Sequence, residues 1–175
     1  MAGDSALMVI DMQQGLFDEG AFEPERLVKQ VKTLIDHARS SNIPVIYVQH
    51  NEDPQYGGSL VPGKPAHEIH PAIAPQAGDT IIQKFNPSAF QDTNLQDVLA
   101  EKGIKHLVLS GMQTEMCVDS TSRDAYGRGY KVTIASDAHS TMDNGVLTAD
   151  QIIKHTNATQ RMFAKIKPTD EITFE

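Results

Sequence analysis

Short apolar runs alternate along this chain with longer stretches whose apolar residues recur at helical spacing, and no other feature restricts the fold as much. The run Ala6 to Ile10 is apolar throughout, which is typical of a strand buried on both faces of a sheet. Pro24 can open the stretch that follows, whose apolar residues suit one face of a helix: Leu27, Val31, Leu34, Ile35 and Ala38. The same patterns predict strands over residues 43–48, 80–83, 106–110, 130–135 and 171–174, and helices over 95–103, 114–127 and 147–163.

Strands that alternate with helices predict a three-layer α/β fold, in which helices cover both faces of a mostly parallel, doubly wound sheet. A length of 175 residues suits a single domain, which we expect to span residues 1–175. Between residues 49 and 78 the chain is rich in Pro, Gly, His and Asn and shows no lasting period. Loops of that length are usually functional or disordered, so this one is predicted to be a lid that sets specificity.

Charge balance and cysteine content argue against several classes of function. The chain has 15 basic and 23 acidic side chains, for a formal charge of −8, whereas nucleic-acid binding needs clustered Lys and Arg. No apolar run approaches the ~20 residues of a membrane span, and the start MAGDSALMVID lacks the basic beginning and long apolar core of a signal peptide. One cysteine cannot form a disulfide within the chain. We therefore expect a cytoplasmic protein that binds neither nucleic acid nor membranes.

Polar residues stand just past the predicted strands. They are Asp11 after the first strand, Gln49 and His50 after the second, Lys84 after the third, Gly111 to Cys117 after the fourth and Asp137 after the fifth. Ligands of such sheets bind beyond the carboxyl ends of the strands, where the strand order reverses. An acid, a lysine and a thiol are therefore expected together at one edge of the sheet.

Asp11, Lys84 and Cys117 together supply the parts needed for acyl transfer. Only the thiolate of Cys117 is a good nucleophile, and a position in the first turn of a helix that begins near Thr114 favours it. Asp11 can take the thiol proton and return it to a leaving amine, Lys84 can stabilise both anions, and N–H groups of the turn can form an oxyanion hole. Each residue also has a structural interpretation: Cys117 as a small core residue, Asp11 as a loop cap, Lys84 as a solvated charge, and Thr114 as an N-cap that accepts the Cys117 N–H.

Three segments of the sequence, in this order, resemble motifs of a known protein family. They are residues 9–13 (VIDMQ) followed by Phe17, residues 84–90 (KFNPSAF), and residues 111–118 (GMQTEMCV) with Asp124 and Asp137 beyond them. Together they resemble the isochorismatase-like superfamily of cysteine hydrolases, which includes nicotinamidases, N-carbamoylsarcosine amidases, ureide amidohydrolases and isochorismatases. The match covers almost the whole chain.

The resemblance implies a six-stranded, Rossmann-like parallel sheet with strand order 3-2-1-4-5-6 and a catalytic triad of Asp11, Lys84 and Cys117. It also implies a cis peptide bond at Met112–Gln113. By analogy, this bond directs the N–H groups of Gln113 and Cys117 at the substrate oxygen, which favours the oxyanion hole over the Thr114 cap. Family members are commonly dimers or tetramers, so a homodimer or homotetramer is expected.

Departures from the subfamilies bear on metal and substrate. Metal-dependent nicotinamidases carry Asp-x-His after the second strand, where this chain reads Gln49 to Pro54 without that spacing. His67 and His70 remain, but a pair is too few for a zinc site, so we expect no metal and no cofactor. Isochorismatases that cleave a vinyl ether do not need the thiol. Cys117 therefore favours cleavage of a C–N bond in a small amide, ureide or carbamoyl compound through a thioester; a vinyl-ether hydrolase and a non-catalytic binding protein are the alternatives.

The substrate pocket is assigned to residues in or near the matching segments. Aromatic walls are expected from Phe17, Phe85 and Phe90, and polar contacts from Gln13 and His50. Asp124 and Asp137 match family positions, but we expect no catalytic role for either, since Asp124 lies two helical turns beyond Cys117.

Overall fold

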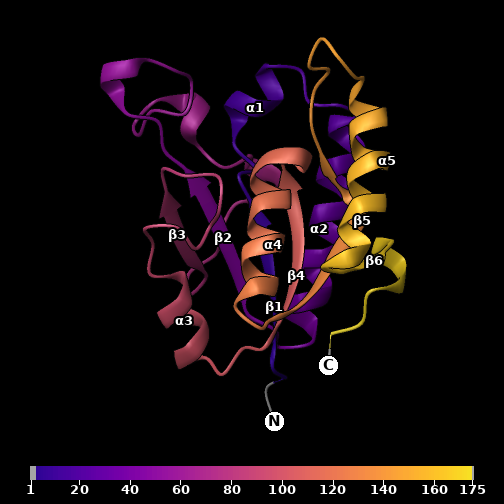
Figure 1. Cartoon of the computed structure of the whole chain (residues 1–175). Coiled ribbons are helices and arrows are strands. Elements are labelled where there is room, and N and C mark those ends of the chain that lie inside the picture. The colour runs from indigo at the N-terminus through magenta and orange to yellow at the C-terminus, as the bar shows by residue number, and fades with distance from the viewer. Residues whose placement is uncertain (1–2, 175) are drawn as a thin grey trace.

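A computed structural model describes residues 3–174 and shows six strands in one parallel sheet, in the order β3-β2-β1-β4-β5-β6 (Figure 1). Met1, Ala2 and Glu175, which end the predicted domain, lie outside the described residues. The strands are β1 (Ser5–Ile10), β2 (Val45–His50), β3 (Thr80–Lys84), β4 (His106–Met112), β5 (Lys131–Ser140) and β6 (Lys165–Lys167). The α-helices are α1 (Gln14–Asp18), α2 (Pro24–Ser40), α3 (Leu95–Glu101), α4 (Asp119–Gly127) and α5 (Ala149–Thr159). The predicted fold class and strand order are confirmed.

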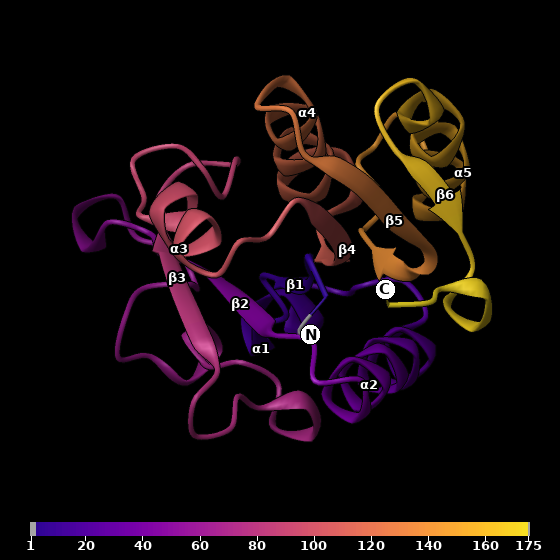
Figure 2. The same ribbon diagram turned by 90° about the horizontal axis from the view of Figure 1, so that it is seen from below.

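The central strand β1 divides the core into two layers because its side chains alternate between the two faces of the sheet. Leu7 and Val9 pack with the apolar stripe of α2, whereas Ala6, Met8 and Ile10 pack with residues of α3 and α4. All six residues of β1 are buried, as the apolar run predicts. Figure 2 shows α2 on one face and α3, α4 and α5 on the other.

The predicted strand over residues 171–174 is wrong, because the last strand is β6, which pairs with β5. Pro168 follows β6, and the chain then forms a short turn at Thr169–Glu171. Ile172 and Phe174 alternate as in a strand, but they pack against the core on the α2 side. The predicted last helix is also shorter than expected: α5 ends at Thr159 and a 3-10 turn follows at Gln160–Met162.

The carboxyl ends of β1 to β4 meet below the long loop that joins β2 and β3 (Figure 1). That loop contains 3-10 turns at Pro54–Tyr56, Pro65–His67 and Pro71–Ile73. A β-bridge between Gln13 and Ile69 joins the second half of this loop to the segment that follows β1. Within residues 3–174, no helix is both long and apolar enough to cross a membrane.

Candidate active site

Asp11 and Lys84 form a buried ion pair at the edge where the strands end. Asp11 follows β1 with a φ of 47°, and its backbone N–H donates to the Val48 carbonyl oxygen (2.9 Å). Lys84 is the last residue of β3, and its Nζ lies 2.7 Å from Asp11 Oδ2. Each residue is only 1% exposed, so neither charge is stabilised by bulk water. Lys84 is therefore not a solvated surface charge, which was the structural interpretation open from the sequence.

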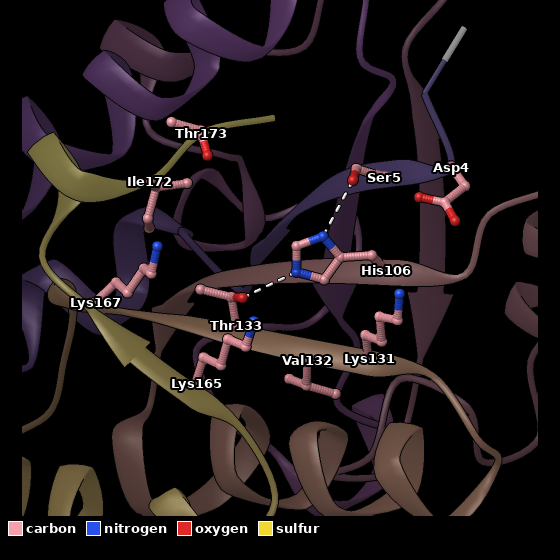
Figure 3. A pocket seen from close by; sticks show the side chains of 10 residues that line it. All are labelled: Asp4, Ser5, His106, Lys131, Val132, Thr133, Lys165, Lys167, Ile172 and Thr173. Atoms are coloured by element: carbon pink, nitrogen blue, oxygen red, sulfur yellow. Dashed lines mark hydrogen bonds between the residues drawn. The ribbon is translucent and has the colours of Figure 1, made fainter. Parts of the chain in front are cut away.

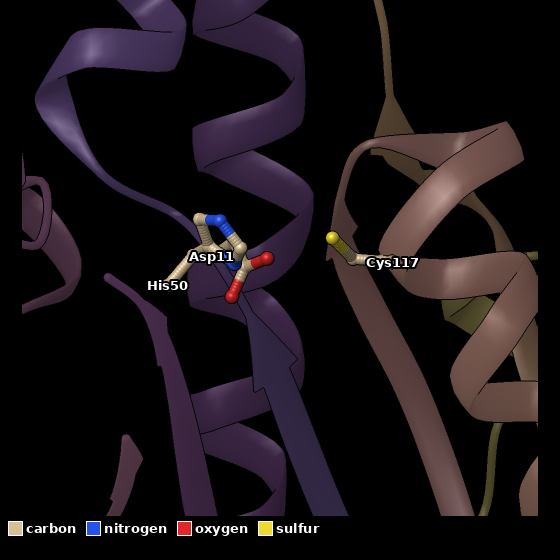
Figure 4. A group of neighbouring side chains, drawn as sticks. All are labelled: Asp11, His50 and Cys117. Carbon is tan, nitrogen blue, oxygen red and sulfur yellow. The ribbon is translucent and has the colours of Figure 1, made fainter. Parts of the chain in front are cut away.

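Cys117 stands opposite this pair, in a π-helical turn (Thr114–Val118) that leads into α4. The Val118 N–H donates to the Gln113 carbonyl oxygen (3.1 Å), and the Cys117 Sγ lies 3.2 Å from Lys84 Nζ. Figure 4 shows the Cys117 sulfur and the Asp11 carboxylate pointing toward one another.

The resting thiol is protonated, contrary to the expectation that its position favours the thiolate. Burial raises the pKa of Cys117 to about 12, and the Asp11 carboxylate adds to this rise, while the Lys84 ammonium opposes it. Burial and a neighbouring negative charge therefore outweigh the lysine.

Asp11, His50 and Cys117 offer three ligand atoms within 4.8 Å of one another, yet this group does not fit a metal ion. The Lys84 ammonium already lies among them, 2.7 Å from Asp11 Oδ2, 3.0 Å from His50 Nδ1 and 3.2 Å from the sulfur. A divalent ion would place a second positive charge beside it. Burial and the Lys84 charge lower the pKa of His50, which keeps its ring neutral beside the ammonium.

His67 and His70 make hydrogen bonds that stabilise the loop between β2 and β3. His67 is buried, with Nε2 2.6 Å from Asn51 Oδ1 and Nδ1 3.3 Å from Gln49 Nε2. His70 Nδ1 accepts the N–H of Ala72 (3.2 Å).

Hydrogen bonds to residues of β5 and α5 hold the turn that contains Cys117. The Met112–Gln113 peptide bond is cis. The Thr114 hydroxyl, which the sequence allows as a cap for the Cys117 N–H, instead lies 2.8 Å from His139 Nδ1, and no side chain caps this turn. His139 Nε2 lies 2.9 Å from Asn157 Oδ1, and the Asn157 amide nitrogen donates to the Ser136 carbonyl oxygen (3.1 Å). This orientation of Asn157 places the ring proton on Nε2, so His139 Nδ1 accepts from Thr114.

A cavity of about 250 Å³, here called the inner cavity, opens onto Asp11 and Cys117. It is lined by Asp11, Leu16, Glu19, His50, Glu52, Ser59, Leu60, Pro87, Gln113, Met116 and Cys117. A wider space of about 480 Å³, here called the outer hollow, shares His50 and Glu52 with it. The outer hollow is lined by His50, Asn51, Glu52, Asp53, Tyr56, Gly57, Gly58 and Phe85.

Of the five residues expected to bind substrate, His50 and Phe85 line these two spaces and three do not. Gln13 is buried, and its amide binds the backbone N–H and carbonyl of His50 and the carbonyl of His67, so it positions the strand end and the loop. Phe17 packs on the His70 ring, with centroids 4.8 Å apart. Phe90 is 5% exposed and packs beside Tyr130 and under the Arg128 guanidinium.

Other lining residues were missed by sequence reasoning. Glu52, Ser59 and Leu60 belong to the loop predicted to be the lid, but the sequence singled out none of these three. Glu19 has no sequence signal, because its place in the site depends on how α1 packs below that loop.

Asp124 and Asp137 both have structural partners. Asp124 accepts hydrogen bonds from Ser88 Oγ and Arg128 Nε, both at 2.7 Å. Asp137 lies inside β5, not past its end, and accepts from the backbone N–H and hydroxyl of Thr169.

A separate pocket of about 210 Å³ lies at the amino ends of the strands, away from the triad. Figure 3 shows the His106 ring between Ser5 and Thr133, with Oγ atoms 3.1 and 2.9 Å from its two nitrogens. Lys131, Lys165 and Lys167 also line it. It contains no thiol and adds nothing to the triad.

Comparison with known proteins places the chain in a family. The model of the isochorismatase domain matches residues 5–169. The isochorismatase family protein YddQ of Bacillus subtilis is 31% identical over 95% of this chain and 97% of its own. Ureidoacrylate amidohydrolase RutB of Yersinia enterocolitica is 31% identical over 77% of this chain and 74% of its own. The crystal structure of N-carbamoylsarcosine amidase from Thermoplasma acidophilum superposes with a TM-score of 0.79 at 29% identity, over 98% of this chain and 99% of that one. The chain therefore belongs to the isochorismatase family of hydrolases.

Proposed function

We propose that this hydrolase cleaves the C–N bond of a small amide, ureide or carbamoyl compound through a thioester on Cys117. One observation carries the proposal: the Lys84 ammonium contacts both the Asp11 carboxylate and the Cys117 sulfur, at 2.7 and 3.2 Å, and Asp11 and Cys117 line the inner cavity. A carboxylate, a cation and a thiol in contact are the groups that nucleophilic acyl transfer requires.

The reaction proceeds in two halves. Asp11 takes the Cys117 proton, and Lys84 stabilises the resulting thiolate, which attacks the carbonyl carbon. The C–N bond then breaks, and Asp11 returns the proton to the leaving nitrogen, so ammonia or an amine departs. In the second half, Asp11 deprotonates a water molecule that attacks the thioester, which releases the acid and restores the thiol. Asp11 Oδ1 is buried and has no hydrogen-bond partner among the described residues, so it is available to take these protons.

The backbone N–H groups of Gln113 and Cys117 would donate to the carbonyl oxygen as it gains negative charge. Gln113 and Cys117 both line the inner cavity, and the Thr114 hydroxyl is directed to His139 and not to the turn. Relatives named for amide substrates, the ureidoacrylate amidohydrolase and the N-carbamoylsarcosine amidase, support C–N hydrolysis.

The test compares the wild type with Cys117→Ala and Asp11→Asn on a panel of primary amides and ureides, with ammonia release as the measurement. Both variants should lose at least about a hundredfold in kcat, because each removes a group that forms or breaks a bond. Mass spectrometry of the quenched wild type should show the acyl group on Cys117. Ammonia release that survives Cys117→Ala would contradict the thioester. Pyruvate release from isochorismate that survives Cys117→Ala would favour a vinyl-ether hydrolase.

A further inference from the structure

The two spaces above the triad are lined by acidic side chains that no cation compensates. Glu19 lines the inner cavity, Asp53 lines the outer hollow, and Glu52 lines both. No Lys or Arg is among the described residues that line either space. The Lys84 ammonium contacts Asp11 and so neutralises that carboxylate, not these three.

Glu52 and Glu19 are held in place by neutral donors. Glu52 Oε2 accepts the backbone N–H of Leu60 (2.7 Å), and Glu19 Oε1 accepts the Ser59 hydroxyl (2.8 Å). Within residues 3–174 neither has an ion-pair partner. Each carboxylate therefore lacks a compensating cation among these residues and has a second oxygen for a ligand. Lys64, the lysine of this loop, donates to the Gly58 carbonyl oxygen (3.0 Å) and lines neither space.

The outer hollow adds two aromatic rings to these charges. Tyr56 is 84% exposed and Phe85 is 63% exposed, although large aromatic side chains are usually buried. An aromatic face attracts ammonium groups, and a carboxylate beside it does so more strongly. His50, which lines both spaces, has a lowered pKa and so adds no positive charge.

We propose that the substrate carries a cationic group, an ammonium, that lies in the outer hollow against Glu52, Asp53 and the rings of Tyr56 and Phe85. The amide carbonyl then reaches Cys117 through the inner cavity. This inference rests on the proposed function, since it describes the substrate of the same site. A substrate that carries a carboxylate would meet three acidic side chains and no Lys or Arg among the described residues that line the two spaces.

Three primary amides of matched length test the proposal: ω-aminohexanamide, heptanamide and pimelic acid monoamide, whose ends are cationic, neutral and anionic. The wild type should prefer the cationic amide to the neutral one by about tenfold or more in kcat/KM, the effect of one charge-assisted hydrogen bond, and should turn over the anionic amide least. Glu52→Gln should reduce that preference to within about threefold. The Gln oxygen can still accept the Leu60 N–H, so this variant removes charge and keeps the loop contact.

Glu101→Gln is the matched control, because Glu101 is exposed at the end of α3 and lines neither space. It should leave the preference unchanged. Equal turnover of the cationic and neutral amides by the wild type would overturn this inference and leave the proposed function standing. Failure of the wild type to release ammonia from any amide would instead contradict the proposed function. In that case, calorimetric titration of Cys117→Ala with ω-aminohexanamide and heptanamide still decides the matter: tighter binding of the cation supports the hollow as an ammonium site, and equal binding rejects it.

Discussion

At the scale of single residues, the site depends on how Asp11 and Lys84 act on one sulfur atom. Burial raises the pKa of Cys117, the carboxylate raises it further, and the ammonium lowers it. A protonated thiol is protected from indiscriminate alkylation and oxidation, because only the thiolate reacts readily. In the proposed mechanism, the nucleophile therefore forms only when the proton moves to Asp11.

Replacement of Asp11 by Asn should separate reactivity toward alkylating agents from catalysis. The change removes the negative charge that raises the pKa of Cys117, while Lys84 stays in place to lower it, so a larger fraction of the thiol ionises near neutral pH. Iodoacetamide should then alkylate Cys117 faster than in the wild type, although ammonia release falls by about a hundredfold or more.

The measurement is the alkylation rate followed by intact mass at one pH. Asp97→Asn, a charge removal on the exposed face of α3, serves as the control and should leave the rate unchanged. Slower alkylation of Asp11→Asn than of the wild type would contradict the account of the thiol given above.

Asp11 and Lys84 stand at strand ends and Cys117 stands in the turn after β4, so the apolar runs predict that the three meet at one edge of the sheet. Their role as a catalytic triad is implied by the resemblance and stays a prediction. The pocket could not be predicted in the same way. Phe90 and Phe85 lie in one matching segment, yet Phe90 packs below Arg128 while Phe85 faces the outer hollow. Which aromatic ring is buried depends on the position of α4 and its arginines, and no local pattern encodes that position.

At the scale of elements, the turn between β4 and α4 is fixed by contacts with β1, β5 and α5. Gly111 approaches β1 so closely that a Cβ would collide with the Ile10 carbonyl oxygen and lie 2.7 Å from the Ile10 nitrogen. The sheet order was predictable because apolar runs and amphipathic stretches alternate. The last strand was not, since Ile172 and Phe174 alternate as in a strand but pack on the α2 side, with the Phe174 ring against His37.

Gly111→Ala should destabilise the protein more than the same change at Gly78. Both glycines have positive φ, at 116° and 97°, so both substitutions carry the strain of a left-handed backbone, about 1–3 kcal/mol. Only at Gly111 does the new methyl group meet neighbouring backbone, since nothing lies within 4 Å of a Cβ at Gly78. Overpacking adds about 1–3 kcal/mol at Gly111, which urea unfolding measures. Equal losses at the two positions would show that the contact with Ile10 has no cost.

His139 should make stability fall in mild acid. Burial lowers the pKa of His139 below 6.5, so in mild acid the unfolded chain binds a proton more readily than the folded chain does. The stabilisation is complete above pH 6.5 and is lost as pH falls toward the folded pKa, at up to about 1.4 kcal/mol per pH unit for one histidine. His50, His67 and His70, whose pKa values are also lowered by burial, contribute in the same direction.

His139→Gln should therefore unfold at lower urea than the wild type at neutral pH, yet show a shallower decline in stability below pH 6.5. The exposed His155 on α5 supplies a His→Gln control. An equal loss of slope in both variants would contradict the assignment to His139.

At the scale of the whole molecule, a chain of net charge −8 has its candidate active site beneath a loop that itself adds acidic side chains to the lining. The homodimer or homotetramer implied by the resemblance stays a prediction, which sedimentation of the purified protein checks, and so does the cytoplasmic setting. The amino-acid composition predicts the sign of the net charge. It does not predict the acidic lining, because that lining depends on how the loop folds.

Added salt should lower kcat/KM for cationic amides more than for neutral ones. The field of the whole chain and the acidic lining attract a cation, and screening shortens the reach of that field from ~30 Å at about 0.01 M salt to ~3 Å at about 1 M. Over this range kcat/KM for ω-aminohexanamide should fall severalfold, whereas heptanamide carries no charge and should change little. Glu52→Gln should flatten the salt dependence, and Glu101→Gln should flatten it much less, because Glu101 is remote from the outer hollow. A parallel decline for both amides would mean that salt acts on the protein and not on the attraction between charges.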